Sequence, residues 1–342
     1  MLEAVQLGNT GLRVSELCLG TMNFGIPGRG HQGDWTLTLE EARPIVKAAI
    51  DHGLFYFDCA DIYGLGASEE VVGALLKELL PRDEYVLATK IAMPMGRGAN
   101  QGGLSRKHVR EGIDACLQRT GHDYIDHLVI HRHPHGIPGS ARTPIEETLE
   151  ALHDAVKEGK VLYLGGSSMF AWQFAELQLT AKMNNWTPFV SMQNHHNLVY
   201  REEEREMNPY CASTGVALTP WSPLARGILA GSYQGGFSGG STSRSQGQDR
   251  KRTEGLYQGD HVFPIAERVI ETASKYECSP AQIAVAWLKG RPEVTSPIVG
   301  VSKVSQLEDL VAAAAIELAA EDVAYLEELY QPVENLLSIG TS

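Results

Sequence analysis

Eight short β-rich runs alternate with amphipathic helical patterns from residue 14 onward, and this alternation predicts an α/β fold of the (β/α)8 TIM-barrel class. Several runs, such as the one at residues 161–167, are almost continuously apolar, as expected for strands buried on both faces. The length of 342 residues suits one large barrel, so we expect residues 1–342 to form a single domain.

The expected strands follow one another in a regular order along the chain. They cover residues 17–22, 54–58, 85–90, 124–131, 161–167, 189–193, 216–221 and 296–300. A doubly wound open sheet is the alternative, but such a sheet usually has fewer strands and needs a topological switch point. The count of eight strands therefore favours the closed barrel.

Helices between these strands begin and end at recognisable signals. Capping boxes at residues 38–41, 143–146 and 279–282 predict three helix N-termini, the last with Pro280 at the first helical position. Gly53 and Gly159 stand where a helix commonly ends in a left-handed residue. These signals predict helices as the connections between strands.

Residues 232–261 interrupt this rhythm. The segment is rich in Gly, Ser, Gln and Arg and has no hydrophobic periodicity. Because it follows the seventh strand, we expect a long, flexible loop over the cofactor or the active site at the C-terminal mouth of the barrel. A disordered surface insertion is the alternative.

Composition and charge exclude several classes of protein. The chain has 29 Lys and Arg residues against 42 Asp and Glu residues, for a formal charge of −13, which disfavours nucleic-acid and anionic-membrane partners. No run of about 18 apolar residues predicts a membrane span, and the first 16 residues do not resemble a signal peptide. Five widely spaced cysteines indicate reduced thiols and a cytoplasmic location.

Chemically active side chains stand at the ends of neighbouring expected strands. Asp58, Lys90 and His131 end strands two, three and four, and Tyr63 follows the first of them closely. A buried lysine needs a partner such as Asp58, and its charge should lower the pKa of a nearby phenol from about 10. His131 could polarise a substrate carbonyl. These groups can protonate an oxygen while hydride reaches carbon, although Asp58 and Lys90 alone could be a structural ion pair.

At this point the chain resembles the aldo-keto reductase family over essentially its whole length. The resemblance rests on motifs in the family's order: Leu7–Ser15 as an N-terminal β-hairpin, Leu19–Gly25, Asp58 with Tyr63-Gly64, Thr89-Lys90, Tyr124–Asp126 with Ile130–Arg132, Gly159–Gly165 with Ser167, Gln193-Asn194, and Pro220–Leu224. It implies a barrel enzyme that reduces aldehydes and ketones to alcohols, reversibly, with NADPH/NADP+ and without a metal.

The resemblance also assigns site residues. The catalytic four would be Asp58, Tyr63, Lys90 and His131, with Tyr63 as the general acid. Cofactor contacts would come from Thr21, Met22, Asp58, Ser167, Ser168, Gln193, Trp221, Ser222, Pro223, Leu224, Ala225, Arg226, Gly227, Gly300, Ser302, Lys303, Gln306 and Asp309. Lys303 would bind a 2′-phosphate, which favours NADPH over NADH. Phe24, Trp35, Tyr63 and His131 would contact the substrate.

Three departures from the family pattern stand out. Many relatives have Asn at the positions of Ser168 and Leu310, and the loop at residues 132–142 is longer than expected and should border the substrate pocket. The Trp221–Ala225 and Gln306–Asp309 stretches are most similar to those of bacterial members related to potassium-channel β subunits. Some of those relatives carry Asn in place of the histidine, so His131 indicates a competent reductase.

Two other functions remain possible from the sequence. The chain could be an NADPH-binding redox-sensing subunit with negligible turnover, or, more remotely, a metal-dependent hydrolase that uses His131 and His133. The Gly28–Gly33 stretch spells a dinucleotide-binding pattern, but four residues separate it from the next helix, so we interpret it as a flexible loop. The small-molecule substrate, the reaction direction and the choice between monomer and homo-oligomer are not encoded in a readable pattern.

Overall fold

The computed structural model describes residues 1–30, 33, 35–137, 140, 142–233, 235–247 and 249–335. The expected loops at residues 28–33, 132–142 and 232–261 each contain positions outside these ranges. No helix among the described residues is long and apolar enough to cross a bilayer.

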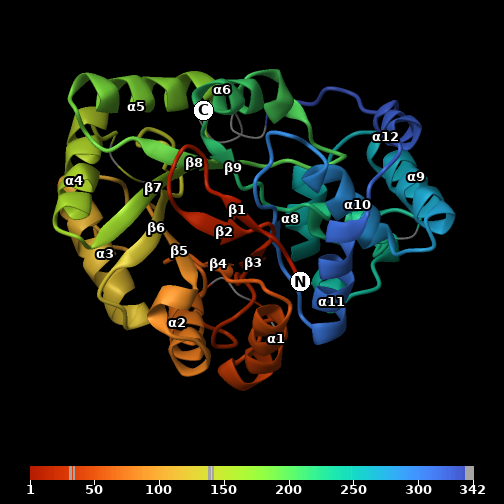
Figure 1. Cartoon of the computed structure of the whole chain (residues 1–342), viewed down its shortest axis with the longest axis horizontal. Coiled ribbons are helices and arrows are strands. Elements are labelled where there is room, and N and C mark those ends of the chain that lie inside the picture. The colour runs from red at the N-terminus through yellow and green to blue at the C-terminus, as the bar shows by residue number, and fades with distance from the viewer. Residues whose placement is uncertain are drawn as a thin grey trace.

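A parallel sheet of eight strands forms the centre of the molecule (Figure 1). In spatial order the strands are β10 (Ile298–Val299), β3 (Cys18–Gly20), β4 (Tyr56–Asp58), β5 (Val86–Ile91), β6 (Ile125–Ile130), β7 (Val161–Ser167), β8 (Phe189–Gln193) and β9 (Ala217–Leu218). Parallel bridges join Leu218 to Val294 and Trp221 to Ile298, so the last strand meets the first. The structure thus confirms the predicted barrel.

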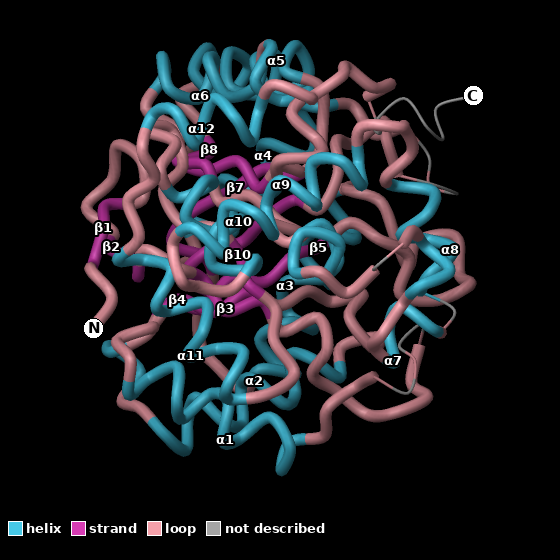
Figure 2. The backbone as a smooth tube through the Cα atoms, turned by 90° about the vertical axis from the view of Figure 1, so that its right-hand side faces the viewer, coloured by secondary structure: helices cyan, strands magenta, loops and turns pink. Residues whose placement is uncertain are grey.

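Helices connect the strands and surround the sheet (Figures 1 and 2). They are α1 (Leu39–Asp51), α2 (Ala67–Leu79), α3 (Arg106–Thr120), α4 (Ile145–Lys157), α5 (Ala171–Met183), α6 (Met207–Thr214), α7 (Ser243–Gln246), α8 (Asp249–Leu256), α9 (Val262–Lys275), α10 (Pro280–Lys289), α11 (Val304–Ala312) and α12 (Ala320–Glu327). An antiparallel hairpin of β1 (Ala4–Gln6) and β2 (Arg13–Ser15) precedes the barrel, as the resemblance implies.

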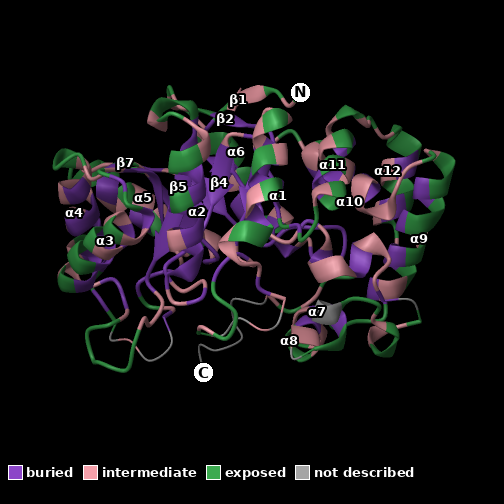
Figure 3. Ribbon diagram, turned by 90° about the horizontal axis from the view of Figure 1, so that it is seen from below, coloured by how far each residue is buried: buried purple, intermediate pink, exposed green. Residues whose placement is uncertain are grey.

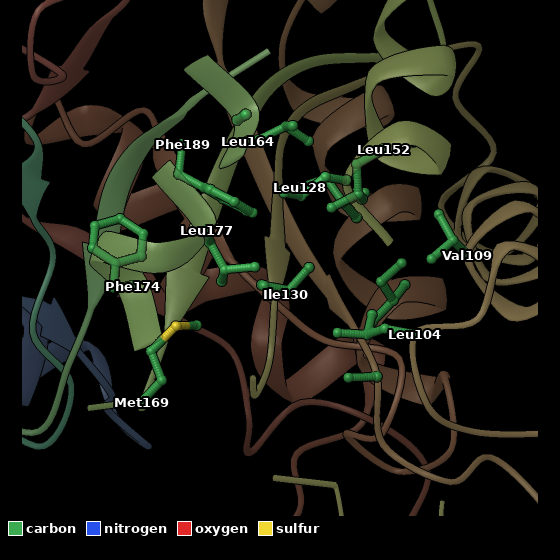
Figure 4. Packing of buried hydrophobic residues seen from close by; sticks show 14 of the residues in the cluster. Leu104, Val109, Leu128, Ile130, Leu152, Leu164, Met169, Phe174, Leu177 and Phe189 are labelled. Carbon is green, nitrogen blue, oxygen red and sulfur yellow. The ribbon is translucent and has the colours of Figure 1, made fainter. Parts of the chain in front are cut away.

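The largest apolar cluster lies between β6–β8 and the helices that cover them. Figure 4 shows Leu128, Ile130 and Leu164 from the strands packed with Leu152 and Leu177 from α4 and α5. All five side chains are buried. At roughly 25 cal/mol per Å² of apolar surface removed from water, such packing is the main favourable term that holds the helices on the sheet.

Inside the barrel, a polar layer replaces part of the apolar filling. The buried His127 ring on β6 is hydrogen-bonded on one side to the hydroxyl of Tyr56, at 2.8 Å, and on the other to the hydroxyl of Ser191, at 2.7 Å. Burial, assisted by Lys90, lowers the pKa of His127 to about 3, so the ring is neutral. This layer fixes β4, β6 and β8 relative to one another.

Some element boundaries differ from the prediction. The strands at β7 and β8 match their predicted limits, whereas β3, β9 and β10 are shorter, because residues such as Trp221 keep only isolated bridges beyond the ladder. The capping box expected at residues 143–146 is wrong. Pro144 itself, with ψ of 135°, is the non-helical N-cap of α4, so the helix begins one residue later than predicted and Thr143 lies outside it. The boxes at Thr38 and Ser279 are confirmed.

The segment after β9 contains more secondary structure than its sequence suggested. It includes the short helices α7 and α8, and Tyr257 just beyond them is buried. Figure 3 shows α7 and α8 on the side of the molecule opposite the β1–β2 hairpin. The carboxyl ends of the parallel strands lie on that same side, so α8 lies near the mouth of the barrel.

Candidate active site

The carboxyl ends of neighbouring strands bring three predicted residues together. Asp58 is the last residue of β4, Lys90 is the next-to-last residue of β5, and His131 directly follows β6. In-register parallel pairing aligns these strands, so residues far apart in the chain meet at one rim.

Asp58 and Lys90 form a buried ion pair. The Lys90 Nζ donates to Asp58 Oδ2 at 2.6 Å and to the carbonyl oxygen of Cys59 at 2.8 Å. Lys90 has no exposed surface. Burial opposes its charged form, but Asp58, Tyr63 and Cys59 together outweigh burial and raise the pKa of Lys90. Lys90 is therefore a permanent cation in the site.

Tyr63 lies against this cation. Its hydroxyl is 3.3 Å from Lys90 Nζ, and the ammonium also lies 4.8 Å from the centre of the phenol ring. Burial raises the pKa of Tyr63, Lys90 lowers it, and the net shift is upward. The expected net decrease is thus not seen, because desolvation of the phenolate exceeds the effect of Lys90. The phenol carries its proton at neutral pH.

His131 completes the group as a neutral ring. Its edge meets the Tyr63 ring, with centroids 5.9 Å apart and planes at 84°. Burial, then Lys90, Arg132 and Arg252, lowers the pKa of His131 well below its usual range. Its Nδ1 atom is buried and lacks a hydrogen-bond partner among the described residues. A neutral imidazole beside a phenol can donate to a carbonyl oxygen without delivering a charge.

Gln193, at the end of β8, joins the site through Asp58. Its Nε2 donates to Asp58 Oδ1 at 2.9 Å, so the two oxygens of Asp58 hold two different partners. Ser167, at the end of β7, donates its hydroxyl to the carbonyl of Gln193 at 2.9 Å. The buried Oδ1 of Asn194 has no partner among the described residues. With its nitrogen held by Asp58, the Gln193 amide offers its oxygen as an acceptor for a ligand amide.

Trp221 is held from two directions. Its indole nitrogen donates to the hydroxyl of Ser168 at 3.1 Å, and its ring stacks on His195 at 4.0 Å with planes only 6° apart. His195 stacks in turn on Tyr200, at 4.3 Å, and is hydrogen-bonded to the hydroxyl of Tyr257, at 2.8 Å. Ser168, predicted as a cofactor contact, thus bonds to the tryptophan in this structure.

The turn at Ser222–Gly227 has an unusual backbone. Four of its residues have positive φ: Ser222, Ala225, Arg226 and Gly227, at 58°, 46°, 57° and 100°. Left-handed residues in such turns form concave nests of amide groups that bind anions. The turn therefore suits a pyrophosphate. The Arg226 guanidinium pairs with Asp249 on α8 and donates to Thr253 at 3.1 Å.

The predicted adenosine-binding residues lie around the start of α11. Gly300, Ser302, Lys303 and Gln306 are exposed. Gln306 accepts hydrogen bonds from the amide and hydroxyl of Ser302, at 2.8 and 3.1 Å, and Asp309 accepts from Ser279 on α10, at 2.6 Å. Lys303 is the N-cap residue of α11, where the helix favours a nearby phosphate.

The remaining residues predicted to contact the cofactor or the substrate differ in how far they are buried. Thr21 is buried and donates its hydroxyl to the carbonyl of Asp58 at 2.9 Å, whereas Met22 and Trp35 are partly exposed. Phe24 has no exposed surface and packs in the core beside α1, so it lines no open pocket in this structure. Its position in the loop after β3 predicted a residue at the mouth of the barrel, but its side chain is buried in the apolar core.

Sequence reasoning missed the residues that support Trp221. His195, Asn197 and Tyr257 have no motif spacing that connects them. The structure alone shows His195 stacked on the Trp221 ring and hydrogen-bonded to the other two. The metal alternative also has a structural test. The described residues contain no group of three or more His, Cys, Asp or Glu side chains that could hold a metal ion.

Comparison with known proteins identifies relatives over the whole site. Residues 16–331 match the model of the aldo/keto reductase family. A Schizosaccharomyces pombe protein that bears the name aryl-alcohol dehydrogenase is 44% identical over 96% of this chain and 95% of its own length. Versiconal hemiacetal acetate reductase of Aspergillus parasiticus is 40% identical over 97% of this chain and 98% of its own.

A third relative, an aldo-keto reductase of Fusarium vanettenii, is 41% identical over 95% of this chain and 90% of its own length. All three relatives are fungal. They do not support the expected likeness to bacterial members related to potassium-channel β subunits, because the short Trp221–Ala225 and Gln306–Asp309 stretches on which that expectation rested cover too little of the chain to rank relatives.

Proposed function

Because this chain belongs to the aldo-keto reductase family of oxidoreductases, which act on carbonyl and alcohol groups, we propose that it is an NADPH-dependent reductase of aldehydes or ketones. The observation that carries the proposal is the placement of Lys90 between Asp58 and Tyr63, within hydrogen-bond distance of both. A purely structural ion pair between Asp58 and Lys90 would not require the Tyr63 hydroxyl within hydrogen-bond distance of the lysine.

Tyr63 is the general acid in this proposal. Its hydroxyl gives a proton to the substrate oxygen while the substrate carbon accepts hydride, so that the carbonyl becomes an alcohol. Lys90 stabilises the phenolate that forms, and Asp58 keeps Lys90 charged and in place. The reverse reaction runs through the same groups, with the phenolate taking the proton back.

Neutral His131 orients the substrate oxygen. An imidazole that donates one hydrogen bond fixes the carbonyl beside Tyr63 without adding a second positive charge next to Lys90. Such a donor aimed at the oxygen that gains charge lowers the barrier to reaction.

The chain's own groups fit a nicotinamide dinucleotide. NADPH would supply the hydride. Gln193 and Ser167 would hold its carboxamide, Trp221 would support its ring, and the nest at Ser222–Gly227 would bind its pyrophosphate. Lys303 would select NADPH through the 2′-phosphate.

The test is an assay of NADPH oxidation with a panel of aldehydes and ketones that includes nitrobenzaldehyde. We expect turnover by the wild-type chain, and the Tyr63→Phe variant should lose about two to four orders of magnitude in kcat while NADPH binding is unchanged. Tight NADPH binding without turnover across the panel would instead favour a redox-sensing subunit. A Tyr63→Phe variant with nearly normal kcat would show that another group is the acid.

A further inference from the structure

Arg132 stands directly beside the catalytic group. It follows His131 in the chain, and its Nη1 donates to the His131 carbonyl at 2.7 Å, which folds the side chain back toward the site. Its guanidinium interacts electrostatically with Tyr63. No carboxylate of the described residues forms an ion pair with it. Arg132 is thus a cation at the mouth without an anionic partner in the described chain.

Arg252 approaches the same point from α8. One turn of this helix is fixed to the barrel, because Asp249 and Thr253 both bind Arg226. Arg252 interacts electrostatically with Tyr63 and His131, and also repels Arg132. It is exposed, so solvent and ligands reach it. Two elements distant in sequence therefore direct guanidinium groups at one mouth.

This concentration of positive charge contrasts with the chain as a whole, whose formal charge is −13. Burial and the neighbouring guanidinium lower the pKa of Arg132, and Tyr63 only partly opposes them. Two like charges held near each other raise the free energy of the site, and Asp249, which attracts Arg252 but is already paired with Arg226, offsets this repulsion only in part. An anion placed between them would remove that repulsion, and a guanidinium fork binds a carboxylate with two parallel hydrogen bonds.

Building on the proposed reductase function, we infer that Arg132 and Arg252 form an anion subsite that selects carbonyl substrates carrying a carboxylate. The cofactor's phosphates are anions too, but the nest at Ser222–Gly227 and Lys303 already provide for them, on the side of the barrel that follows β9 and β10. Arg132 follows β6, next to the residue that orients the substrate oxygen. Its position therefore favours the substrate as the source of the anion.

The experiment compares two aldehydes that differ in one charge, 4-carboxybenzaldehyde and its neutral methyl ester, methyl 4-formylbenzoate. We expect the wild-type chain to prefer the acid. Arg132→Gln and Arg252→Gln should each lower kcat/KM for the acid by about tenfold or more, mainly through KM, because each removes a charged hydrogen-bond donor. The ester should change by much less, and NADPH affinity should stay constant.

Arg250→Gln is the matched control, since Arg250 lies on the same helix but pairs with Glu254 at 2.7 Å. It should leave the acid-to-ester ratio unchanged. The inference is overturned if the wild type does not prefer the acid, or if the two glutamine variants weaken both aldehydes equally. Weaker NADPH binding in these variants would also overturn it, because it would assign the guanidinium groups to the cofactor.

A binding measurement separates this inference from the proposed function. Terephthalate, which cannot be reduced by this chemistry, is titrated into the wild type and both glutamine variants, with and without NADP+. Weaker terephthalate binding by the variants supports the anion subsite even if neither aldehyde is turned over. Equal binding by all three proteins overturns the subsite and leaves the reductase proposal standing on its own assay.

Discussion

At the ends of β4, β5 and β8, the buried Lys90 and Gln193 both bond to Asp58, whereas in the region expected to bind the cofactor's phosphates and adenosine Arg226 and Asp309 bond to Asp249 and Ser279 outside the barrel strands. The first region needs no rearrangement before it can act. In the second, a bound phosphate competes with interactions that the chain already makes.

The comparison indicates that the strand ends hold their side chains in fixed positions, whereas the loops and short helices do not. Strands fix the groups that meet the reacting atoms, since electrostatic stabilisation works best when donors are oriented in advance. Loops and short helices carry the groups that grip the rest of the ligand. Substitutions in each of the two regions should therefore have different effects on stability and on cofactor binding.

The largest effect on stability should come from Lys90→Met. This change leaves Asp58 charged and buried without its cation, which should lower the free energy of unfolding by about 3–5 kcal/mol. Chemical denaturation would measure the loss. The double variant Lys90→Met with Asp58→Asn should recover part of it, and a double variant as unstable as the single one would contradict the charge explanation.

The next largest effect concerns Glu203, which is buried next to Glu202 in the segment after β8. Burial and then Glu202 raise the pKa of Glu203 to about 8, so the folded protein favours the protonated carboxyl. Its contribution to stability is therefore full below the ordinary glutamate pKa of about 4.3 and is lost as pH rises through 8.

Glu203→Gln should consequently be more stable than the wild type at pH 9, by on the order of 2–4 kcal/mol, and nearly equal at pH 4. Thermal or denaturant unfolding across this pH range would measure the difference. A constant difference at every pH would show that the carboxyl does not titrate in this range.

On the cofactor side, Lys303→Ala should weaken NADPH binding by about tenfold through loss of a charged contact to the 2′-phosphate. NADH, which lacks that phosphate, should bind as before. Quenching of intrinsic fluorescence would give both dissociation constants. An equal loss for the two cofactors would remove Lys303 from the role of selecting NADPH.

The smallest predicted effect is that of Asp249→Asn. Removal of this carboxylate frees Arg226 and takes a negative charge away from the phosphate turn, so NADPH should bind about threefold more tightly. Glu254→Gln on the same helix removes the same charge from the Arg250 pair and serves as the control. Weaker binding in Asp249→Asn would mean that Asp249 holds Arg226 in its binding position.

Prediction from sequence succeeded where the regular alternation of strands and helices determines where a residue lies. Because parallel strands end at one rim, the residues that end each run, Asp58, Lys90 and Gln193, could be expected to meet. The limits of β3, β9 and β10 could not be predicted, because an apolar run does not show where its ladder of hydrogen bonds stops. The box at Thr143 failed because Pro144, whose ψ of 135° is non-helical, is itself the N-cap of α4.

The parts that sequence could not provide are contacts between loops. His195 under Trp221 and Arg252 near Tyr63 depend on how segments of no regular pattern fold across the mouth. The sequence of residues 232–261 shows no hydrophobic period, yet Tyr257 is buried there and is hydrogen-bonded to His195 and Asn197. Contacts of this kind between loops produce no regular spacing of residues in the sequence.

The bond between Asp58 and Gln193 has a directional meaning. A carboxylate only accepts hydrogen bonds, so the Gln193 amide must turn its nitrogen toward Asp58 and present its oxygen elsewhere. Asp58 thereby acts on two groups: it holds the Lys90 cation beside the Tyr63 hydroxyl, and it sets the orientation in which the Gln193 amide meets an amide ligand. A change at position 58 that removes this acceptor should therefore free the Gln193 amide to rotate, and so alter the binding of an amide ligand together with the rate.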